Sequence, residues 1–251
     1  MTLVQTEPKK IYMWVEVQPI TVAWIYHNSD LWLISLSSDG INWITIADKN
    51  LWATTVYNSG DTLSESNCGK FYQRWNNYWF SWSWTISSTT TKVNASNYWP
   101  WNYYSWSSFI KVSYWWDWST SQNDNLRWNT TDTLAARQWP CESWFHVPTY
   151  TEYNTLYNTY TALWLSWVTN FIKCIKIPLA WYRDISNATA YNSWVAWYYF
   201  TSVPYNSTQS RALAFDTSII PWSYMDRWHW CSLRPFKNES VQPREWWTKL
   251  N

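Results

Sequence analysis

The sequence predicts an α+β domain built from short antiparallel strands, one or two helices and long loops. Three observations support this class. Short β-like runs alternate with polar turns along most of the chain. One central segment combines a helix start signal with an apolar face at helical spacing. A stretch at 81–131 is rich in Ser, Thr, Asn and Tyr, which is typical of long loops.

The expected strands are short apolar runs that polar residues separate. In chain order they are 32–36 (WLISL), 43–47 (WITIA), 109–112 (FIKV), 175–179 (IKIPL), 197–201 (WYYFT), 212–215 (ALAF) and 231–236 (CSLRPF). We expect the segment 81–131 to form long loops, which in a compact domain are usually functional. A low-complexity insert without fixed structure is the alternative for that segment.

The best helix signal begins at Thr149. Thr149 and Glu152 have the spacing of a capping box, in which each side chain binds a backbone N–H of the other residue. Apolar side chains then recur at helical spacing and make one face: Tyr153, Leu156, Tyr157, Tyr160 and Leu163. Trp164 follows at the position where a left-handed glycine commonly ends a helix.

The chain is 251 residues long, which fits one domain with short flanking segments. We expect 1–20 to be a linker or the end of a preceding region, 21–240 to be a single domain and 241–251 to be a tail. Residues 1–20 lack the basic, apolar and small-residue zones of a signal peptide. Either the chain is cytoplasmic, or this start lies within a longer secreted protein.

Charge and hydropathy exclude several classes of protein. The 18 Lys and Arg nearly balance the 17 Asp and Glu, and the net charge of +1 gives no basic footprint for nucleic acid. No apolar run approaches the roughly 20 residues of a membrane span, so we expect no transmembrane segment. The aromatic content of 22% supplies far more apolar burial than disordered chains have. A folded, nearly neutral, aromatic-rich domain remains.

The tryptophan and glycine counts are both far from ordinary. The chain has 28 Trp and 3 Gly, whereas a chain of this length ordinarily has about 17 glycines. Tryptophan also stands among turn-forming neighbours, as at 75–77 (WNN), 98–102 (YWPWN), 138–141 (QWPC) and 220–223 (IPWS), where glycine usually supplies a positive φ. Our hypothesis is that most of these positions are glycine in the natural protein, with the codon UGA read as Trp. A truly Trp-rich surface, such as a sugar-stacking platform, is the alternative.

Signals for cysteine or histidine chemistry are weak. The cysteines lack CxxC spacing, which argues against a zinc ribbon or a thioredoxin-type site, and they fit either disulfides or reduced buried thiols: Cys68, Cys141, Cys174 and Cys231. Structural or surface roles are expected for the histidines His27, His146 and His229. No G-x-S-x-G, P-loop or H-E-x-x-H motif occurs, even with Trp taken as Gly.

A Tyr-, Ser- and Asn-rich segment at 187–210 resembles the binding loops of other proteins in composition. Tyr supplies contact area at small entropic cost, and Ser and Asn adapt their hydrogen bonds. Together with one acidic residue further on, the predicted ligand-binding residues are Tyr191, Asn192, Tyr198, Tyr199, Tyr205, Asn206 and Asp226. An exposed β-hairpin with ordinary turns is the alternative.

A second candidate site is a loop at 117–125 that is rich in oxygen ligands. Calcium takes six to eight oxygens from flexible loops, and the candidate ligands here are Asp117, Asn123 and Asp124. The glycine and glutamate arrangement of an EF-hand is missing, and Asn and Asp also build turns without a metal. Calcium is therefore the one candidate cofactor.

With Trp taken as Gly, an ordered string of motifs emerges. Residues 143–152 become SGFHVPTYTE, 177–184 become IPLAGYRD, 197–202 become GYYFTS and 227–237 become RGHGCSLRPFK. This order resembles the Fibrobacter succinogenes major paralogous domain family of bacterial surface proteins and lipoproteins. The family pattern runs G-W/Y-H-V-P-T-x-x-E-W, L-P-x-A-G-x-R, Y-W-S-S and G-x-S-V-R-C/P-x-K.

The resemblance covers roughly residues 40–238 and includes 48–54 and 68–77 in the amino-terminal half. The chain departs from the pattern at Phe145 and Phe200, which stand where the family often has Trp or Tyr. The resemblance implies a C-type-lectin-like fold, in which a scaffold of short strands and one or two helices displays long loops. That fold is shared with the formylglycine-generating enzyme and with ligand-binding variable proteins of bacteria and phages.

The family resemblance and the loop composition together predict a surface-exposed or secreted bacterial binding module without catalytic activity. We expect it to act outside the cell or in the cell envelope and to bind a carbohydrate or protein ligand through the loops 81–131 and 187–230. One alternative is an enzyme of the formylglycine-generating type that uses Cys231, although the paired cysteines of that chemistry have no counterpart here. The other is a phage tail receptor-binding domain.

The coding DNA tests the glycine hypothesis directly. We expect UGA codons at most tryptophan positions and ordinary glycine codons at Gly40, Gly60 and Gly69. Sequencing the gene, or measuring the mass of the protein from its native host, provides the measurement. UGG codons at most of these positions would contradict the hypothesis.

Overall fold

The structure is a computed structural model. It describes residues 24–29, 32–39, 41–73, 79–81, 86–92, 108–111, 141–162, 168–180, 182–183, 190–191, 197–206, 209–215, 219–226 and 229–238. The expected linker at 1–20 and tail at 241–251 lie outside these residues, as does most of the expected loop segment 81–131.

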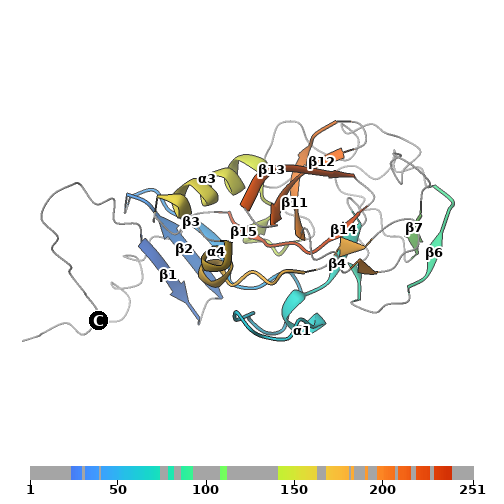
Figure 1. Ribbon diagram of the computed structural model, residues 1–251, viewed down its shortest axis with the longest axis horizontal. Helices are drawn as coiled ribbons and strands as arrows, with labels where there is room; N and C mark the ends of the chain where they lie inside the picture. Colours follow the sequence, from blue (N-terminus) through green and yellow to red (C-terminus); the bar gives the residue numbers. More distant parts are fainter. Residues whose placement is uncertain are drawn as a thin grey trace, which may run out of the picture.

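The described residues form many short strands and few helices (Figure 1). The strands are β1 (Trp24–Asn28), β2 (Leu33–Ser37), β3 (Ile44–Ala47), β4 (Phe71–Gln73), β5 (Trp79–Phe80), β6 (Ser88–Thr89), β7 (Phe109–Ile110), β8 (Phe145–His146), β9 (Tyr182–Arg183), β10 (Ala190–Tyr191), β11 (Trp197–Pro204), β12 (Gln209–Phe215), β13 (Ile219–Asp226), β14 (Trp230–Cys231) and β15 (Phe236–Lys237). The helices are α1 (Glu65–Cys68), α3 (Tyr150–Thr161) and α4 (Val168–Ile175). This mixture is compatible with the predicted α+β class.

The first sheet joins segments from both ends of the described chain. Its order is β1-β2-β3-β15-β8, and all its pairings are antiparallel. Phe236 of β15 pairs with Ile46 on one side and with His146 on the other. The middle of this sheet therefore forms only when residues almost two hundred positions apart come together.

Two further antiparallel sheets complete the scaffold, beside a short parallel pair. The second sheet has the order β10-β9-β14-β4-β5, and the third consists of β11, β12 and β13 in sequence order. The pair β6–β7 is parallel, which corrects the expectation of antiparallel strands throughout. The long strands of the third sheet make it the largest continuous surface of paired backbone in the described chain (Figure 1).

Most of the predicted strands are present, with two errors. The runs at 32–36, 43–47, 197–201 and 212–215 correspond to β2, β3, β11 and β12. The run at 231–236 is not one strand, because β14 ends at Cys231, residues 233–235 form no ladder and β15 begins at Phe236 in another sheet. The run at 175–179 is not a strand, because Ile175 ends α4 and the residues after it form no ladder. A short apolar run fits a buried helix end as well as a strand, so the apolar pattern of 175–179 did not distinguish the two.

Helix α3 confirms its sequence signal. Thr149 is the N-cap, and its hydroxyl accepts the Glu152 backbone N–H at 3.1 Å while the Glu152 carboxylate accepts the Thr149 backbone N–H at 2.7 Å. The predicted face is buried at Tyr153, Leu156 and Tyr160. The expected glycine-like stop at Trp164 lies outside the described residues.

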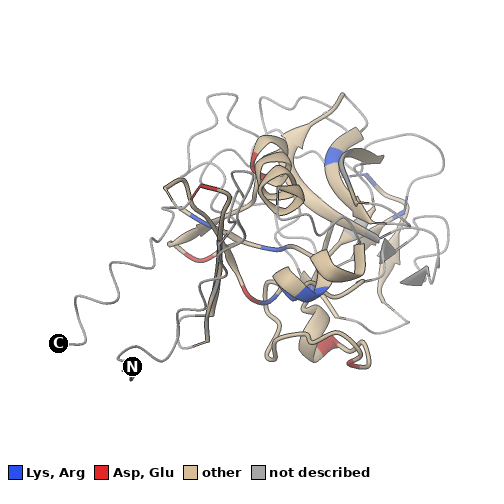
Figure 2. Ribbon diagram, turned by 60° about the vertical axis from the view of Figure 1, so that its left-hand side comes forward, with Lys and Arg blue, Asp and Glu red and all other residues tan. Residues whose placement is uncertain are grey.

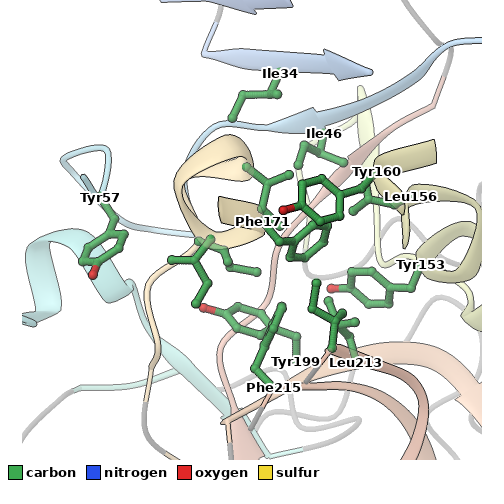
Figure 3. Close-up of a cluster of buried hydrophobic side chains, with 14 of the residues drawn as sticks. Ile34, Ile46, Tyr57, Tyr153, Leu156, Tyr160, Phe171, Tyr199, Leu213 and Phe215 are labelled. Carbon is green, nitrogen blue, oxygen red and sulfur yellow. The ribbon is translucent and has the colours of Figure 1, made fainter. Parts of the chain in front are cut away.

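The main core fills the space between the first sheet, the helices α3 and α4, and the third sheet (Figure 3). Its members come from all these elements: Ile34, Ile46, Tyr153, Leu156, Tyr160, Phe171, Tyr199, Leu213 and Phe215. The Tyr160 and Phe171 rings meet edge to face with centroids 4.7 Å apart, a geometry that adds roughly 0.5–1.5 kcal/mol beyond the buried area. The core is therefore aromatic, yet every described ring in it belongs to Tyr or Phe.

The third sheet is buried on both faces for part of its length. Tyr199 and Leu213 contribute to the main core, whereas the adjacent Phe200 and Ala212 belong to a second cluster with Leu51 and other apolar residues. Successive strand residues point to opposite faces, so this split follows from the pleat. The sheet is thus held from both sides and forms a rigid support.

Arg234 connects the sheets and α4 from inside the protein. Its side chain is fully buried and donates to the backbone carbonyls of Ala47 (2.8 Å), Ile175 (3.4 Å) and Lys176 (2.8 Å), and to the Asn50 side chain (3.0 Å). Burial lowers the pKa of Arg234 to about 10, which leaves the guanidinium charged at neutral pH. One side chain therefore satisfies carbonyls from the end of β3 and from the end of α4.

Asn50 extends this network across the core. Its amide donates to the Cys68 carbonyl at 3.0 Å and to the Tyr199 hydroxyl at 3.1 Å, and that hydroxyl in turn donates to the Pro178 carbonyl. Each of these buried polar groups has a partner, as buried polar groups require. The network fixes where the third sheet lies relative to the first.

Backbone conformation and exposure both single out tryptophan. Trp32 and Trp52 have φ of 60° and 62°, the left-handed region that normally belongs to glycine, and Lys176 is the third described non-glycine residue there. None of the tryptophans with described side chains is buried: Trp32, Trp43, Trp52, Trp79 and Trp144. Trp32 and Trp52 thus have the backbone conformation that the glycine hypothesis predicts. The turn expected at 220–223 is wrong, because these residues lie in β13, and the hypothesis stays a prediction about the gene.

The surface of the described chain has no strong charge pattern. Figure 2 shows acidic and basic residues spread over loops, helices and strands, with neither sign gathered on one face. Among the described residues, no helix has the length and apolarity needed to cross a bilayer.

We expect Trp52→Gly to stabilise the protein. The left-handed conformation costs a non-glycine residue roughly 1–2 kcal/mol, and glycine loses roughly 0.5–1 kcal/mol in extra chain entropy, so the net gain is about 0.5–1 kcal/mol. The Trp52 indole is 59% exposed and contributes little packing. Urea denaturation measures the change. Trp79→Gly, in a strand with ordinary φ, is the control and should lower stability; a loss in both variants would contradict the argument.

We expect Arg234→Met to destabilise the protein by about 3 kcal/mol or more, because the buried carbonyls of Ala47 and Lys176 and the Asn50 side chain lose their donor. The same denaturation midpoint measures it. Lys173→Met is the matched control, since it removes an exposed positive charge at the same end of α4 and should change stability by under about 0.5 kcal/mol. Equal effects in the two variants would show that the network is not needed.

Candidate functional site

The candidate site lies where the third sheet extends past the start of α3. Leu213 and Phe215 of β12 are buried in the main core under α3. Arg211, two residues before Leu213 on the same face of β12, instead meets Tyr150, the first residue of α3. Figure 1 shows α3 beside one end of this sheet and the strands running on beyond it. Side chains on that face are therefore no longer covered by the helix.

Four side chains from four segments stack at this place, and we call them the tyrosine–arginine array: Tyr150, Arg211, Tyr205 and Tyr224. The Tyr205 and Tyr224 rings are nearly parallel, with an interplanar angle of 10° and centroids 5.0 Å apart. The Arg211 guanidinium carbon lies 4.4 Å from the Tyr205 ring centroid and 5.1 Å from that of Tyr150. Both distances fall within the range of a cation–π interaction.

The array presents aromatic surface to solvent. Tyr205 is 45% exposed and Tyr224 is 51% exposed, which is unusual for a stacked pair on paired backbone. Of the large apolar side chains exposed in the described chain, these two are in ring contact with each other. Exposed aromatic pairs of this kind are typical of surfaces that bind a ligand.

Hydrogen bonds join Tyr205 and Asn206, which follow β11, to Gln209 at the start of β12. The backbone N–H of Tyr205 donates to the Gln209 carbonyl at 2.9 Å, and the Asn206 side chain accepts the Gln209 backbone N–H at 2.8 Å. The Asn206 amide also donates to the Gln209 side-chain oxygen at 2.9 Å. Tyr205 is therefore held in place before any ligand arrives.

An irregularity in β11 positions Arg211. The β11–β12 register shifts between Phe200 and Pro204, and within this bulge the Thr201 hydroxyl donates to the Arg211 carbonyl at 2.7 Å. Arg211 pairs directly with Tyr224 of β13, so the two side chains share a face of the sheet. Bulges commonly redirect side chains in this way.

Two of the sequence-predicted ligand residues, Tyr205 and Asn206, belong to this place. Tyr199 is fully buried in the core and has no surface to offer a ligand, and Tyr198 is half-buried against the second core cluster. Asp226 pairs in register with Gln209 at the end of β13.

The remaining predicted site residues are not brought to the array by any described contact. Tyr191 lies in β10 of the second sheet, where it pairs with Tyr182 of β9, and only its backbone position is described. Asn192 and the candidate calcium ligands Asp117, Asn123 and Asp124 lie outside the described residues. In the part of the chain that the structure describes, no group of three or more His, Cys, Asp or Glu is placed to hold a metal ion.

Sequence reasoning missed Arg211, Tyr224 and Tyr150. Arg211 comes directly before the apolar run ALAF of β12, and Tyr224 stands beside the buried Met225 near the end of β13. A charged residue in a strand next to a Tyr-rich hairpin was the available signal. Their meeting depends on the register of β12 with β13, which no local pattern states.

The four cysteines are free thiols. Cys231 is fully buried, its Sγ lies 3.3 Å from the Met225 sulfur, and burial raises the pKa of its thiol well above the usual value. Burial likewise raises the pKa of Cys68 and of Cys174 to about 12. A reactive cysteine needs an accessible thiolate, whereas the Cys231 thiol is buried and its pKa is raised by that burial.

Two histidines make structural contacts. The buried His146 ring lies between the Glu152 carboxylate (2.8 Å) and the Asn238 side chain (3.0 Å), and so links the start of α3 to the end of β15. His27 contacts the buried Asp48 carboxylate at 3.0 Å.

Comparisons of the chain with protein-family models, with curated proteins and with solved structures found no match.

We expect the thiols to be unreactive in the folded protein. With an aromatic disulfide reagent at pH 8, reaction should be slow until denaturant is added, after which all four thiols should react. A Cys174→Ser variant should remove most of the residual reactivity, because Cys174 is the least buried. Fast native labelling that disappears in Cys231→Ser would contradict this expectation and restore a catalytic role for that residue.

Proposed function

We propose that this protein is a surface-exposed binding module that holds a saccharide on the exposed rings of Tyr205 and Tyr224. The observation that carries the proposal is the stacked, half-exposed ring pair at the open end of the third sheet. Sugar rings have apolar faces that pack against aromatic rings, and their hydroxyls need nearby hydrogen-bonding groups. Asn206 and Gln209 place amide groups beside the pair.

Rigidity supports a binding role. The array lies on strands that are packed from both sides. Next to Tyr205, Asn206 forms two hydrogen bonds with Gln209 at the start of β12. A surface that is already ordered loses little conformational entropy on binding, and this raises affinity. Tyrosine adds large contact area with few rotatable bonds.

The wider setting of the proposal is a C-type-lectin-like domain outside the cell or in the cell envelope. Short strands, few helices and the motif order along the chain support this setting. A protein ligand on the same rings is the second candidate, because Tyr and Arg are also frequent at the centres of protein interfaces.

We expect Tyr224→Ala to weaken binding at least tenfold, since a central aromatic contact contributes about 2 kcal/mol. Retention of the full chain on a glycan array, followed by calorimetry with the best-bound sugar, measures the loss. Tyr224→Phe should keep most of the affinity because the ring stays.

Ile41→Ala is the matched control for exposed apolar surface, since Ile41 is 71% exposed in the turn before β3. It should leave binding unchanged. Unchanged retention of Tyr224→Ala would refute the proposed surface, and thermal unfolding of each variant shows that the fold is intact.

A further inference from the structure

The array contains a cation, Arg211, that has no ion pair with a described acidic side chain. The guanidinium of Arg211 stacks on the rings of Tyr205 and Tyr150. The ion pairs in the described part of the chain join His27 to Asp48, Lys70 to Glu65 and His146 to Glu152, and none includes Arg211. A half-buried arginine without an acidic partner is available to an acidic ligand.

Stacking also defines which part of the guanidinium is available. Rings that contact the flat face leave the N–H groups at the edge of the plane, and a carboxylate matches that edge with two parallel hydrogen bonds. The guanidinium lies against Tyr205, and Arg211 pairs in register with Tyr224, the two rings on which a sugar is proposed to stack.

We propose that the saccharide bound by this module is acidic, a sugar whose carboxylate pairs with Arg211 while its ring packs on Tyr205 and Tyr224. This inference rests on the proposed saccharide-binding function and narrows its ligand class. Sugar carboxylates occur in uronic acids within polymers and in sialic acids at chain ends, and the chemistry recognised at Arg211 is the same for both.

The described contacts of the nearby acidic residues do not include Arg211. Glu152, two residues after Tyr150, contacts His146 and caps the helix at Thr149. The backbone of Asp226 pairs with Gln209, two residue pairs along the sheet from the Arg211–Tyr224 pair.

Matched probes test the charge separately from the sugar. The full chain is titrated with polygalacturonate and with the same polymer after methyl esterification, and in parallel with sialyllactose and with lactose. We expect at least one acidic probe to bind about tenfold more tightly than its neutral counterpart, the size of one charge-assisted pair. The preference should fall as salt is raised from 0.05 M to 0.5 M, while binding of the neutral probe should stay constant.

Variants then assign the preference to one side chain. Arg211→Gln should bring the acidic probe down to the affinity of the neutral one, and Arg211→Lys should restore part of the difference. Lys237→Gln removes the same charge at a cation that stacks on Trp144 instead, and it should keep the full preference. Because the salt series uses the unaltered protein, it decides whether the ligand is recognised by its charge even where an Arg211 variant fails to fold.

Each result has a distinct meaning. Equal, Tyr224-dependent binding of acidic and neutral probes overturns the acidic ligand and leaves the proposed function standing. No binding of any saccharide overturns both. A preference that persists in Arg211→Gln places the charge recognition elsewhere, and equal binding of polyglutamate shows that the surface takes acidic chains without a sugar ring.

Discussion

The buried guanidinium of Arg234 is the interaction on which the rest of the structure depends. A charged group without solvent is very costly unless strong acceptors surround it. Arg234 finds them in the carbonyls that end β3 and α4 and in the Asn50 side chain. Those acceptors belong to segments that are far apart in the chain and also share the main core, so the need to solvate one cation adds a directional constraint to how the first sheet, α4 and the third sheet pack together.

The candidate site depends on that arrangement. Asn50 accepts a hydrogen bond from Arg234 and donates one to the Tyr199 hydroxyl, and so connects Arg234 to β11. Strand β11 ends just before Tyr205. Because α3 caps one end of the third sheet and leaves the other uncovered, Tyr205 and Tyr224 stay at the surface although they stand on core strands. An exposed aromatic pair is stable there because the core below it is complete without it.

Sequence patterns that act within a few residues predicted structure better than patterns whose outcome depends on distant segments. The capping box at Thr149 and Glu152 acts within one helical turn, and so the start of α3 follows from four consecutive residues. Tyr199 and Tyr205 have the same side chain six positions apart, yet one is buried and the other is exposed. Strand pairing and the bulge between Phe200 and Pro204 decide that difference, and both arise from contacts with β12.

The sequence by itself determined the α+β character and the helix that follows Thr149, because each depends on neighbours within a few residues. Only the tertiary structure decided that Arg234 is buried, that 175–179 ends a helix, and that Arg211 meets Tyr224 and Tyr205. Those outcomes depend on segments far apart in the chain whose pairing is set by shared burial, which no local pattern records.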